Sequence, residues 1–240
     1  LIVRMCPDAF QTTQWSLVVS ARDDSVDLAR EAFDGLARIY WKPLYAYVRR
    51  RGYSIEESED LVQGFFARFI EKDYLNSVSS DKGRFRAFLL TCIKGYLSDE
   101  YDKQQAQKRG GQLKQITIDT VLMESTLLVR LGTAASPEAA YDRAWAISIL
   151  DEALSRMEKK NTSDGKTRLF TLLKSRLVGG VNRDYTVLAK ETGLNEATLR
   201  KKVQRSREEY ESMVKVVIRD SLQLDEEVDD ELRLLFEALG

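Results

Sequence analysis

Residues 184–207 read DYTVLAKETGLNEATLRKKVQRSR, and this stretch predicts the fold of the C-terminal part of the chain. Leu188 is spaced for the buried face of a first short helix, and Gly193 stands where the chain must turn sharply. Asn195 is a good N-cap for a second short helix, whose buried side carries Leu199 and Val203. This layout is typical of a helix-turn-helix, whose second helix enters the major groove of DNA.

The second helix of this stretch is strongly basic. Residues 195–207 contain five basic side chains and one acid, Glu196. We expect its outward face to reach base edges and its flanks to contact phosphates. The residues predicted to bind DNA through this helix are Thr198, Arg200, Lys201, Lys202, Gln204, Arg205 and Arg207. A helical hairpin with a solvated basic face is the alternative interpretation.

Charge is segregated along the chain, although the formal net charge is only −1. Residues 82–109 hold seven bases and three acids, whereas residues 221–240 hold seven acids and one base, Arg233. The tail also carries apolar residues spaced for one face of a short helix, namely Val228, Leu232, Leu235 and Phe236. Such a tail can pack on its own part of the protein, or cover a basic site until a partner binds.

The composition argues against several classes of protein. Hydrophobic residues make up 43% of the chain and charged residues 31%, which is ordinary for a globular protein, and no apolar run has the length of a membrane span. Two cysteines and the lack of a secretory signal predict a cytoplasmic protein. Histidine and glycine-rich phosphate loops are absent from the sequence. We therefore expect neither an enzyme nor a cofactor or metal site.

Helical periodicity predicts an all-α protein with two helical domains joined by a linker. The predicted divisions are a first domain, a linker, a second domain and an acidic tail, at residues 12–102, 103–136, 137–222 and 223–240. Residues 115–119 are the one weak candidate for a strand.

Local signals place the expected helices of the first domain. We predict one helix over residues 27–40 and another over 41–51. Ser54 and Glu57 form a capping box that opens a third helix. The fourth has an apolar stripe that includes Cys92, which we expect to be a core residue rather than a reactive thiol. Ser136, followed by a proline, is the expected cap of the first helix of the second domain.

Four motifs occur in an order that resembles one protein family. They read YWKPLYAYVRR at 40–50, SEDLVQGFFARF at 58–69, FRAFLLTCIKGYLSD at 85–99 and TLRKKVQRSR at 198–207. Together they are similar to the conserved segments of RNA polymerase sigma factors of the extracytoplasmic-function type. Residues 12–18 and 228–236 resemble a larger subgroup with extensions at both ends.

The resemblance implies a role for each domain. The first would dock on core RNA polymerase, at the clamp of its largest subunit, and recognise the promoter −10 element, and the second would read the −35 element. The implied partners are core polymerase, promoter DNA and an anti-sigma factor or another regulator, without a membrane. The residues assigned to polymerase docking are Glu56, Asp60 and Gln63. Those assigned to the −10 region are Arg84, Arg86, Lys94 and Lys103.

The sequence departs from the family pattern at a few positions. Gly64 stands where the family usually has Glu, and Gly95 where it usually has Asn. Lys201 and Lys202 replace the usual Ser and Arg of the reading helix. Two alternative functions therefore stay open, a stand-alone helix-turn-helix regulator and a sigma-like interaction protein without promoter activity. Binding to core polymerase would separate the first of these from a sigma factor.

Overall fold

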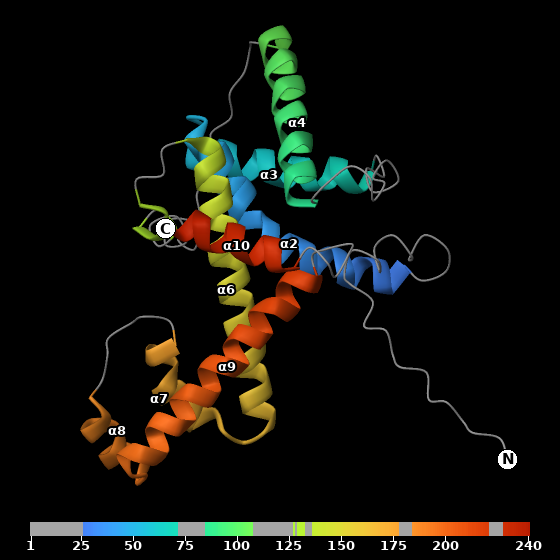
Figure 1. The fold of residues 1–240 in the computed structure, drawn as a ribbon. Helices are drawn as coiled ribbons and strands as arrows, with labels where there is room; N and C mark the ends of the chain where they lie inside the picture. The colour runs from blue at the N-terminus through green and yellow to red at the C-terminus, as the bar shows by residue number, and fades with distance from the viewer. Residues whose placement is uncertain are drawn as a thin grey trace, which may run out of the picture.

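A computed structural model describes residues 26–71, 85–107, 127, 129–132, 136–177, 184–220 and 228–240 (Figure 1). Its helices are α2 (Val26–Arg50), α3 (Ile55–Glu71), α4 (Phe85–Gln107), α6 (Pro137–Ser163), α7 (Thr167–Leu177), α8 (Tyr185–Thr192), α9 (Glu196–Asp220) and α10 (Val228–Leu239). No strand occurs in these ranges, and the prediction of an all-α protein is confirmed. The strand candidate at residues 115–119 lies outside the described residues.

Predicted capping signals mark where two of the helices begin. The Ser54 N–H donates to Glu57 Oε2 at 2.8 Å, and the Glu57 N–H donates to Ser54 Oγ at 3.2 Å. This reciprocal pair is the predicted capping box of α3. Ser136 Oγ accepts the N–H of Ala139 at 3.1 Å, and Pro137 occupies the first position of α6. Local sequence therefore sets the start of both helices.

Two predictions of helix length are wrong. The helices expected over residues 27–40 and 41–51 are one continuous helix, α2, with Pro43 inside it. Proline removes one backbone hydrogen bond, but Pro43 is buried in a run of core residues, and their packing keeps the helix continuous. The second helix of the helix-turn-helix is not short either. It extends to Asp220, because its C-terminal half buries Val217 and Ile218 in the larger core.

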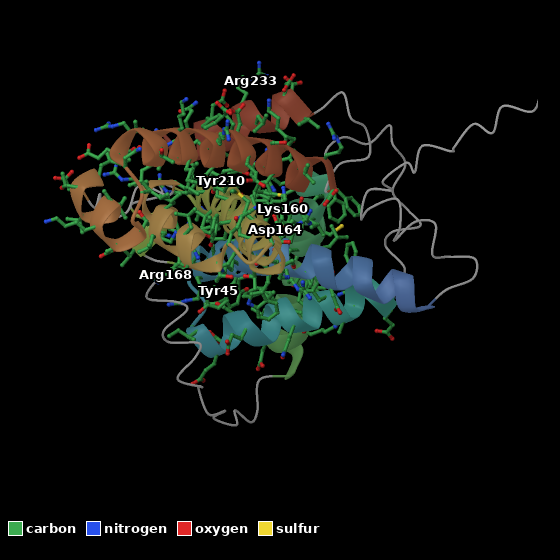
Figure 2. All side chains as sticks on the ribbon, turned by 90° about the horizontal axis from the view of Figure 1, so that it is seen from below. Tyr45, Lys160, Asp164, Arg168, Tyr210 and Arg233 are labelled. Carbon is green, nitrogen blue, oxygen red and sulfur yellow. The ribbon has the colours of Figure 1, made fainter. Side chains whose placement is uncertain are left out.

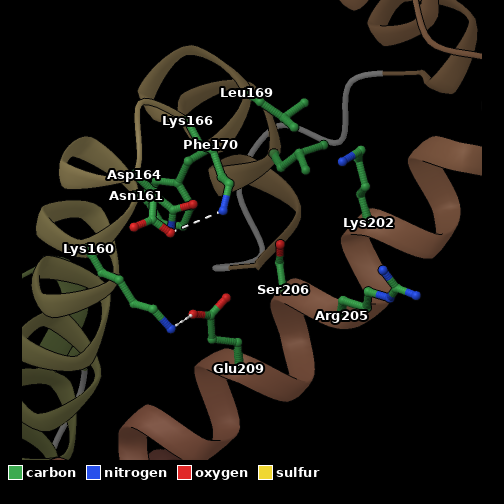
Figure 3. A pocket seen from close by; sticks show the side chains of 11 residues that line it. Lys160, Asn161, Asp164, Lys166, Leu169, Phe170, Lys202, Arg205, Ser206 and Glu209 are labelled. Atoms are coloured by element: carbon green, nitrogen blue, oxygen red, sulfur yellow. Dashed lines mark hydrogen bonds and ion pairs between the residues drawn. The ribbon is translucent and has the colours of Figure 1, made fainter.

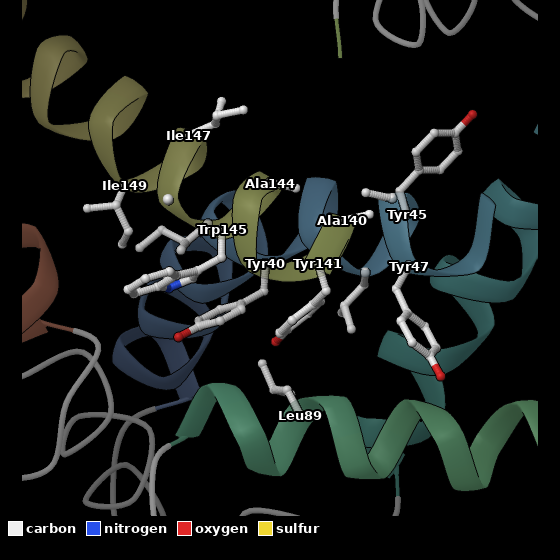
Figure 4. Packing of buried hydrophobic residues seen from close by; sticks show 14 of the residues in the cluster. Tyr40, Tyr45, Tyr47, Leu89, Ala140, Tyr141, Ala144, Trp145, Ile147 and Ile149 are labelled. Atoms are coloured by element: carbon white, nitrogen blue, oxygen red, sulfur yellow. The ribbon is translucent and has the colours of Figure 1, made fainter. Parts of the chain in front are cut away.

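The larger hydrophobic core is rich in aromatic side chains (Figure 4). Tyr40, Tyr141 and Trp145 are at most 1% exposed, and Leu89 of α4 points toward them. The rings of Tyr40 and Phe85 meet edge to face, with centroids 5.4 Å apart. We refer to the elements that share this core as the body, namely α2, α3, α4, the N-terminal half of α6, the C-terminal half of α9, and α10.

The body extends across the predicted domain boundary at residue 136. Helix α6 begins the second predicted domain, yet Ala140 and Ala144 lie in the same core as Ile39 of α2. Helix α6 also packs more extensively on α2 than on any other described helix. The predicted boundary therefore does not separate two hydrophobic cores.

A second, smaller core lies beside the C-terminal end of α6 and the N-terminal end of α9, and this part of the molecule is far from α4 (Figure 1). Its buried members are Leu173, Leu188, Leu199 and Val203. We call α7, α8 and the N-terminal half of α9 the lobe. Helices α6 and α9 connect the lobe to the body and are joined by polar contacts.

The connection between α6 and α9 combines apolar packing with hydrogen bonds. Met157 of α6 and Phe170 of α7 form a third buried cluster. Tyr210 of α9, labelled in Figure 2, donates its hydroxyl to the Leu150 carbonyl at 3.0 Å. Burial raises the pKa of Tyr210 to about 12, so the hydroxyl stays a donor at neutral pH. The lobe is thus attached to the body along two packed helices.

The acidic tail forms helix α10, which packs on α6 and α9. Val228 and Leu235 are buried in the larger core, as the apolar spacing predicted. The prediction for Phe236 is wrong, because its side chain is 68% exposed. Arg233 of α10 points away from the body (Figure 2), whereas Glu231 of the same helix is buried. Helix α10 therefore covers part of the core that it shares with the C-terminal half of α9.

Candidate nucleic-acid interface

The chain between α8 and α9 has the geometry of a helix-turn-helix. Asp184 caps α8 by accepting the N–H of Thr186, and these hydrogen bonds lower the pKa of its carboxyl group. Gly193 ends α8 in the left-handed region, with φ 72°, which favours glycine. Asn195 Oδ1 accepts the N–H of Thr198 at 2.8 Å and caps α9. The predicted turn and both of its signals, Gly193 and Asn195, are confirmed.

The small core of the lobe fixes the direction of the recognition face. Leu199 and Val203 are at most 2% exposed and pack against Leu188. Lys201 and Arg205 lie on the other side of α9 and are exposed, while Thr198 is half-buried beside them. Burial of one side of the helix therefore presents these predicted contacts to a ligand on the other side.

Gln204 and Lys202 flank this recognition face. Gln204 is exposed, and its Nε2 donates to Glu208 Oε1 at 2.9 Å along the helix. Lys202 is half-buried and turns toward α7 (Figure 3). Both side chains can reach past the edge of the helix, which suits contacts to a DNA backbone.

A cavity of about 350 Å³ lies beside the recognition helix, between α9 and the turn that joins α6 to α7 (Figure 3). Its floor is apolar and is formed by α7. Two of its cations are paired, Lys160 with Glu209 at 2.6 Å and Lys166 with Asp164 at 3.1 Å. Lys202 and Arg205 add further positive charge on the α9 side. The positive surface of α9 therefore extends to the end of α6.

Sequence reasoning missed an aromatic residue, Tyr185, on which two arginines of the lobe stack. The guanidinium carbons of Arg176 and Arg200 lie 3.8 Å and 4.2 Å from the ring centroid of Tyr185, the first residue of α8. Arg200 also forms a 3.7 Å ion pair with Glu196, and Arg207 donates to the Arg176 carbonyl at 3.3 Å. The one signal of this arrangement in the sequence is that an aromatic residue, Tyr185, directly follows the N-cap residue Asp184.

The structure gives Arg86 a different role from the one that the resemblance implied. Its side chain is only 13% exposed and forms an ion pair with Asp142 of α6. Its Nε lies 3.7 Å from Glu231 Oε2 of α10, and its guanidinium lies 4.5 Å from the ring centroid of Trp145. Arg86 therefore joins α4 to α6 and α10, and it does not face a DNA strand in this arrangement.

The other basic residues of α4 lie nearer the surface. Lys94 Nζ is 2.7 Å from Glu138 Oε1 of α6, and this bond raises the pKa of Lys94 and lowers that of Glu138. Lys103 is exposed and pairs with Glu100 at 2.6 Å. Arg84 lies outside the described residues. Lys94 and Lys103 are on one helix but the structure does not bring them together with Arg86 into one patch.

The predicted docking residues share helix α3. Asp60 and Gln63 are exposed and Glu56 is half-buried, whereas Leu61 and Phe65 on the same helix are buried in the body. Asp60 and Gln63 are therefore accessible without any change in the core. These side chains suit a partner that carries basic groups.

Packing accounts for one of the two glycine departures. A Cβ at Gly64 would clash with the hydroxyl of Tyr96, which crosses from α4 and whose pKa is raised by burial. A larger residue such as Glu at this position would therefore require the Tyr96 side chain to move. A Cβ at Gly95 would meet no atom within 4 Å. At position 95, an open face of α4 therefore lacks the Asn side chain that the family usually has there.

Three other features can be assessed in the part of the chain that the structure describes, namely a reactive thiol, a metal site and a membrane-spanning helix. Cys92 is partly buried against the larger core, where burial raises the pKa of its thiol to about 11, and this agrees with a packing role rather than a reactive thiol. The described residues contain no group of three side chains that could hold a metal ion. Among the described helices, none has the length and apolar character required to cross a membrane.

Comparison with known proteins identifies one family. No curated protein and no solved structure matches the chain. The family model described as ECF sigma factor matches residues 19–216, which include α2, α3, α4 and the helix-turn-helix and end before α10. The match covers most of the chain, and the protein therefore belongs to the ECF sigma factor family, whose members direct RNA polymerase to promoters.

Proposed function

We propose that this protein guides core RNA polymerase to specific promoters by reading the −35 element with α9 and by engaging and helping to melt the −10 element through α4. One observation supports the proposal most directly. Lys201 and Arg205 are exposed on a helix whose opposite side is held by a buried core. The protein needs no catalytic group of its own for this cytoplasmic role, because polymerase performs the chemistry.

At the −35 element, Thr198, Lys201 and Arg205 contact base edges in the major groove. Gln204 lies beside them. The flanking side chains Arg200, Lys202 and Arg207 bind backbone phosphates. Phosphate contacts set the register of the helix on the duplex, and base contacts select the sequence.

At the −10 element, Arg84, Lys94 and Lys103 bind the DNA strand. Tyr101 of α4 is 56% exposed and offers a ring on which an unstacked base can lie. Contact by Lys94 requires its bond with Glu138 of α6 to break. The DNA strand therefore competes with Glu138 for Lys94 in a surface ion pair that a side-chain rotation can break.

Helix α3 binds the clamp of the largest polymerase subunit. Asp60 and Gln63 project from it, with Glu56 one turn earlier, and Coulomb attraction to basic residues of the clamp directs the association. An anti-sigma factor or another regulator would compete for this surface or for the DNA-binding face of the lobe.

A binding experiment with core polymerase tests this assignment. Asp60→Arg should weaken core binding, because the substitution reverses the charge of an exposed docking residue without touching the core. Asp229→Arg makes the same change of charge on an exposed residue of α10 and serves as the matched control. Unchanged affinity of the Asp60→Arg protein for core polymerase would remove α3 as the docking surface.

Run-off transcription from a library of promoter fragments then separates the alternatives. A sigma factor binds core polymerase and yields start sites with a shared −35 element. Duplex binding without binding to core polymerase would favour a stand-alone regulator. Polymerase binding without any start site would favour a sigma-like interaction protein.

A further inference from the structure

Two arginines of the lobe stack on a single tyrosine. Arg176 from the end of α7 and Arg200 from α9 both place their guanidinium carbons within 4.2 Å of the ring centroid of Tyr185. Arg207, two turns further along α9, donates to the backbone carbonyl of Arg176 at 3.3 Å. Two helices, α7 and α9, therefore bring cations to the beginning of α8, which supplies the ring of Tyr185.

Stacking on a ring leaves an arginine able to bind an anion. The interaction uses the flat face of the guanidinium, while its N–H groups project from the edge of the same plane. A stacked guanidinium has also lost part of its side-chain freedom before any ligand arrives, which lowers the entropic cost of binding. Tyr185 thus orients Arg176 and Arg200 in advance.

Two carboxylates lie close to this cluster. Glu196 lies 3.7 Å from Arg200, and Asp184, whose pKa Arg176 helps to lower, caps α8. Asp184 is exposed and the side chain of Glu196 is 44% exposed. Ion pairs at such positions are weak, so another anion can compete for the arginines.

The location of the cluster indicates its ligand. In a helix-turn-helix the first helix crosses the DNA backbone while the second lies in the major groove. Tyr185 begins that first helix, and Arg200 is on the flank of the second. We propose that Tyr185 positions Arg176 and Arg200 as a binding site for phosphates of the DNA backbone, an inference that rests on the proposed DNA-binding function.

Removal of one cation tests the site without knowledge of the promoter, because phosphate contacts do not depend on sequence. The full-length protein is titrated with a fluorescent duplex of mixed sequence at several salt concentrations. Arg176→Gln should lower affinity and reduce the slope of log Kd against log salt by about 0.9, the value for one lost phosphate contact. Arg168→Gln removes the same charge from the other end of α7, away from Tyr185, and should change the slope less.

Two substitutions of Tyr185 test its positioning role. Tyr185→Phe keeps the ring and should retain the affinity and the salt slope of the original protein. Tyr185→Leu keeps an apolar side chain against the small core but removes the ring, and it should reproduce the loss seen with Arg176→Gln. Helical content and thermal unfolding confirm that each variant is folded. If Tyr185→Leu does not fold, the Arg176→Gln and Arg168→Gln pair still decides whether the site exists.

The outcomes distinguish this inference from the proposed function. An unchanged slope for Arg176→Gln, or an equal loss for Arg168→Gln, overturns the phosphate site. If Lys201→Ala lowers the affinity for a promoter duplex chosen from the run-off experiment while Arg176→Gln leaves the salt slope unchanged, DNA reading by α9 stands and only the site at Tyr185 fails. If no substitution affects binding to DNA, the proposed DNA-binding function itself is wrong.

Discussion

The body and the lobe are built on cores of different size and chemistry. The larger core contains Tyr40, Tyr141, Trp145 and Phe65, all at most 1% exposed. The buried members of the small core are three leucines and a valine. Burial of large aromatic side chains removes much more apolar surface from water than burial of a few aliphatic ones. The lobe must therefore depend more on its caps, its turn and the packing of α6 against α9.

The two regions also treat their cations differently. In the body, Arg86 and Lys94 each form an ion pair with a carboxylate of α6. On the recognition face, Lys201 and Arg205 form no ion pair with any other residue that the structure describes. The body uses its charges to join helices, and the lobe leaves charge available for a polyanion. Ion pairs between helices therefore contribute to packing in the body, whereas exposed cations characterise the recognition face of the lobe.

The largest expected effect is in the body. Phe65→Ala should destabilise the protein by about 3–5 kcal/mol, because it removes a ring that is 1% exposed and contacts Phe69 and Tyr96. Urea unfolding followed by circular dichroism measures the change. Phe236→Ala is the control, since that ring is 68% exposed and its loss should change stability by no more than about 0.5 kcal/mol. Similar effects of the two substitutions would contradict the assignment of the aromatic core.

The same kind of substitution in the lobe should act locally. Leu199→Ala removes a fully buried side chain and should cost about 2–5 kcal/mol, which a core this small cannot absorb. We expect faster hydrogen exchange in α7 and α8, with the amides of α2 and α3 still protected. Equal loss of protection in α2 would show instead that α6 and α9 make the two regions one cooperative unit.

Glu231 of α10 should contribute more than its neighbours to the body. It is only 3% exposed and lies beside Arg86, so Glu231→Gln should cost about 1–3 kcal/mol by weakening a buried contact to a charged group. Asp230→Asn makes the same chemical change at a side chain that is 55% exposed, and its effect on stability should be near zero. Thermal unfolding of both proteins checks this difference. Equal melting temperatures would mean that α10 is held by its apolar residues alone.

The smallest expected effect separates two glycines within the body. Gly95→Ala should stabilise the protein by about 0.5–1 kcal/mol, because an added methyl group meets no atom and the helix gains a better helix former. Gly64→Ala should give no gain, since its methyl group would clash with the Tyr96 hydroxyl. Urea midpoints compare the two variants. A similar gain for both would show that the Tyr96 side chain can move away from position 64 at no cost.

Short-range patterns were sufficient to place many features of the interface. Ser54 with Glu57, Gly193 and Asn195 act on backbone groups within one helical turn, and each occupies the role that its spacing predicted. The exposed positions of Lys201 and Arg205 follow from the burial of Leu199 and Val203 on the same helix. Such features need no knowledge of distant residues, because the partner groups are a few positions away.

Only the tertiary structure decided which helices meet and which charges face inward. Arg86 contacts Asp142, which is 56 positions away, and the ring of Tyr185 stacks with one arginine from α7 and one from α9. Helix α6 joins the core of α2 although the local pattern assigned it to the second domain. Hydrophobic periodicity indicates which face of a helix is buried, but it does not specify the partner helix. That choice depends on the shapes and charges of side chains that folding brings together from distant parts of the chain.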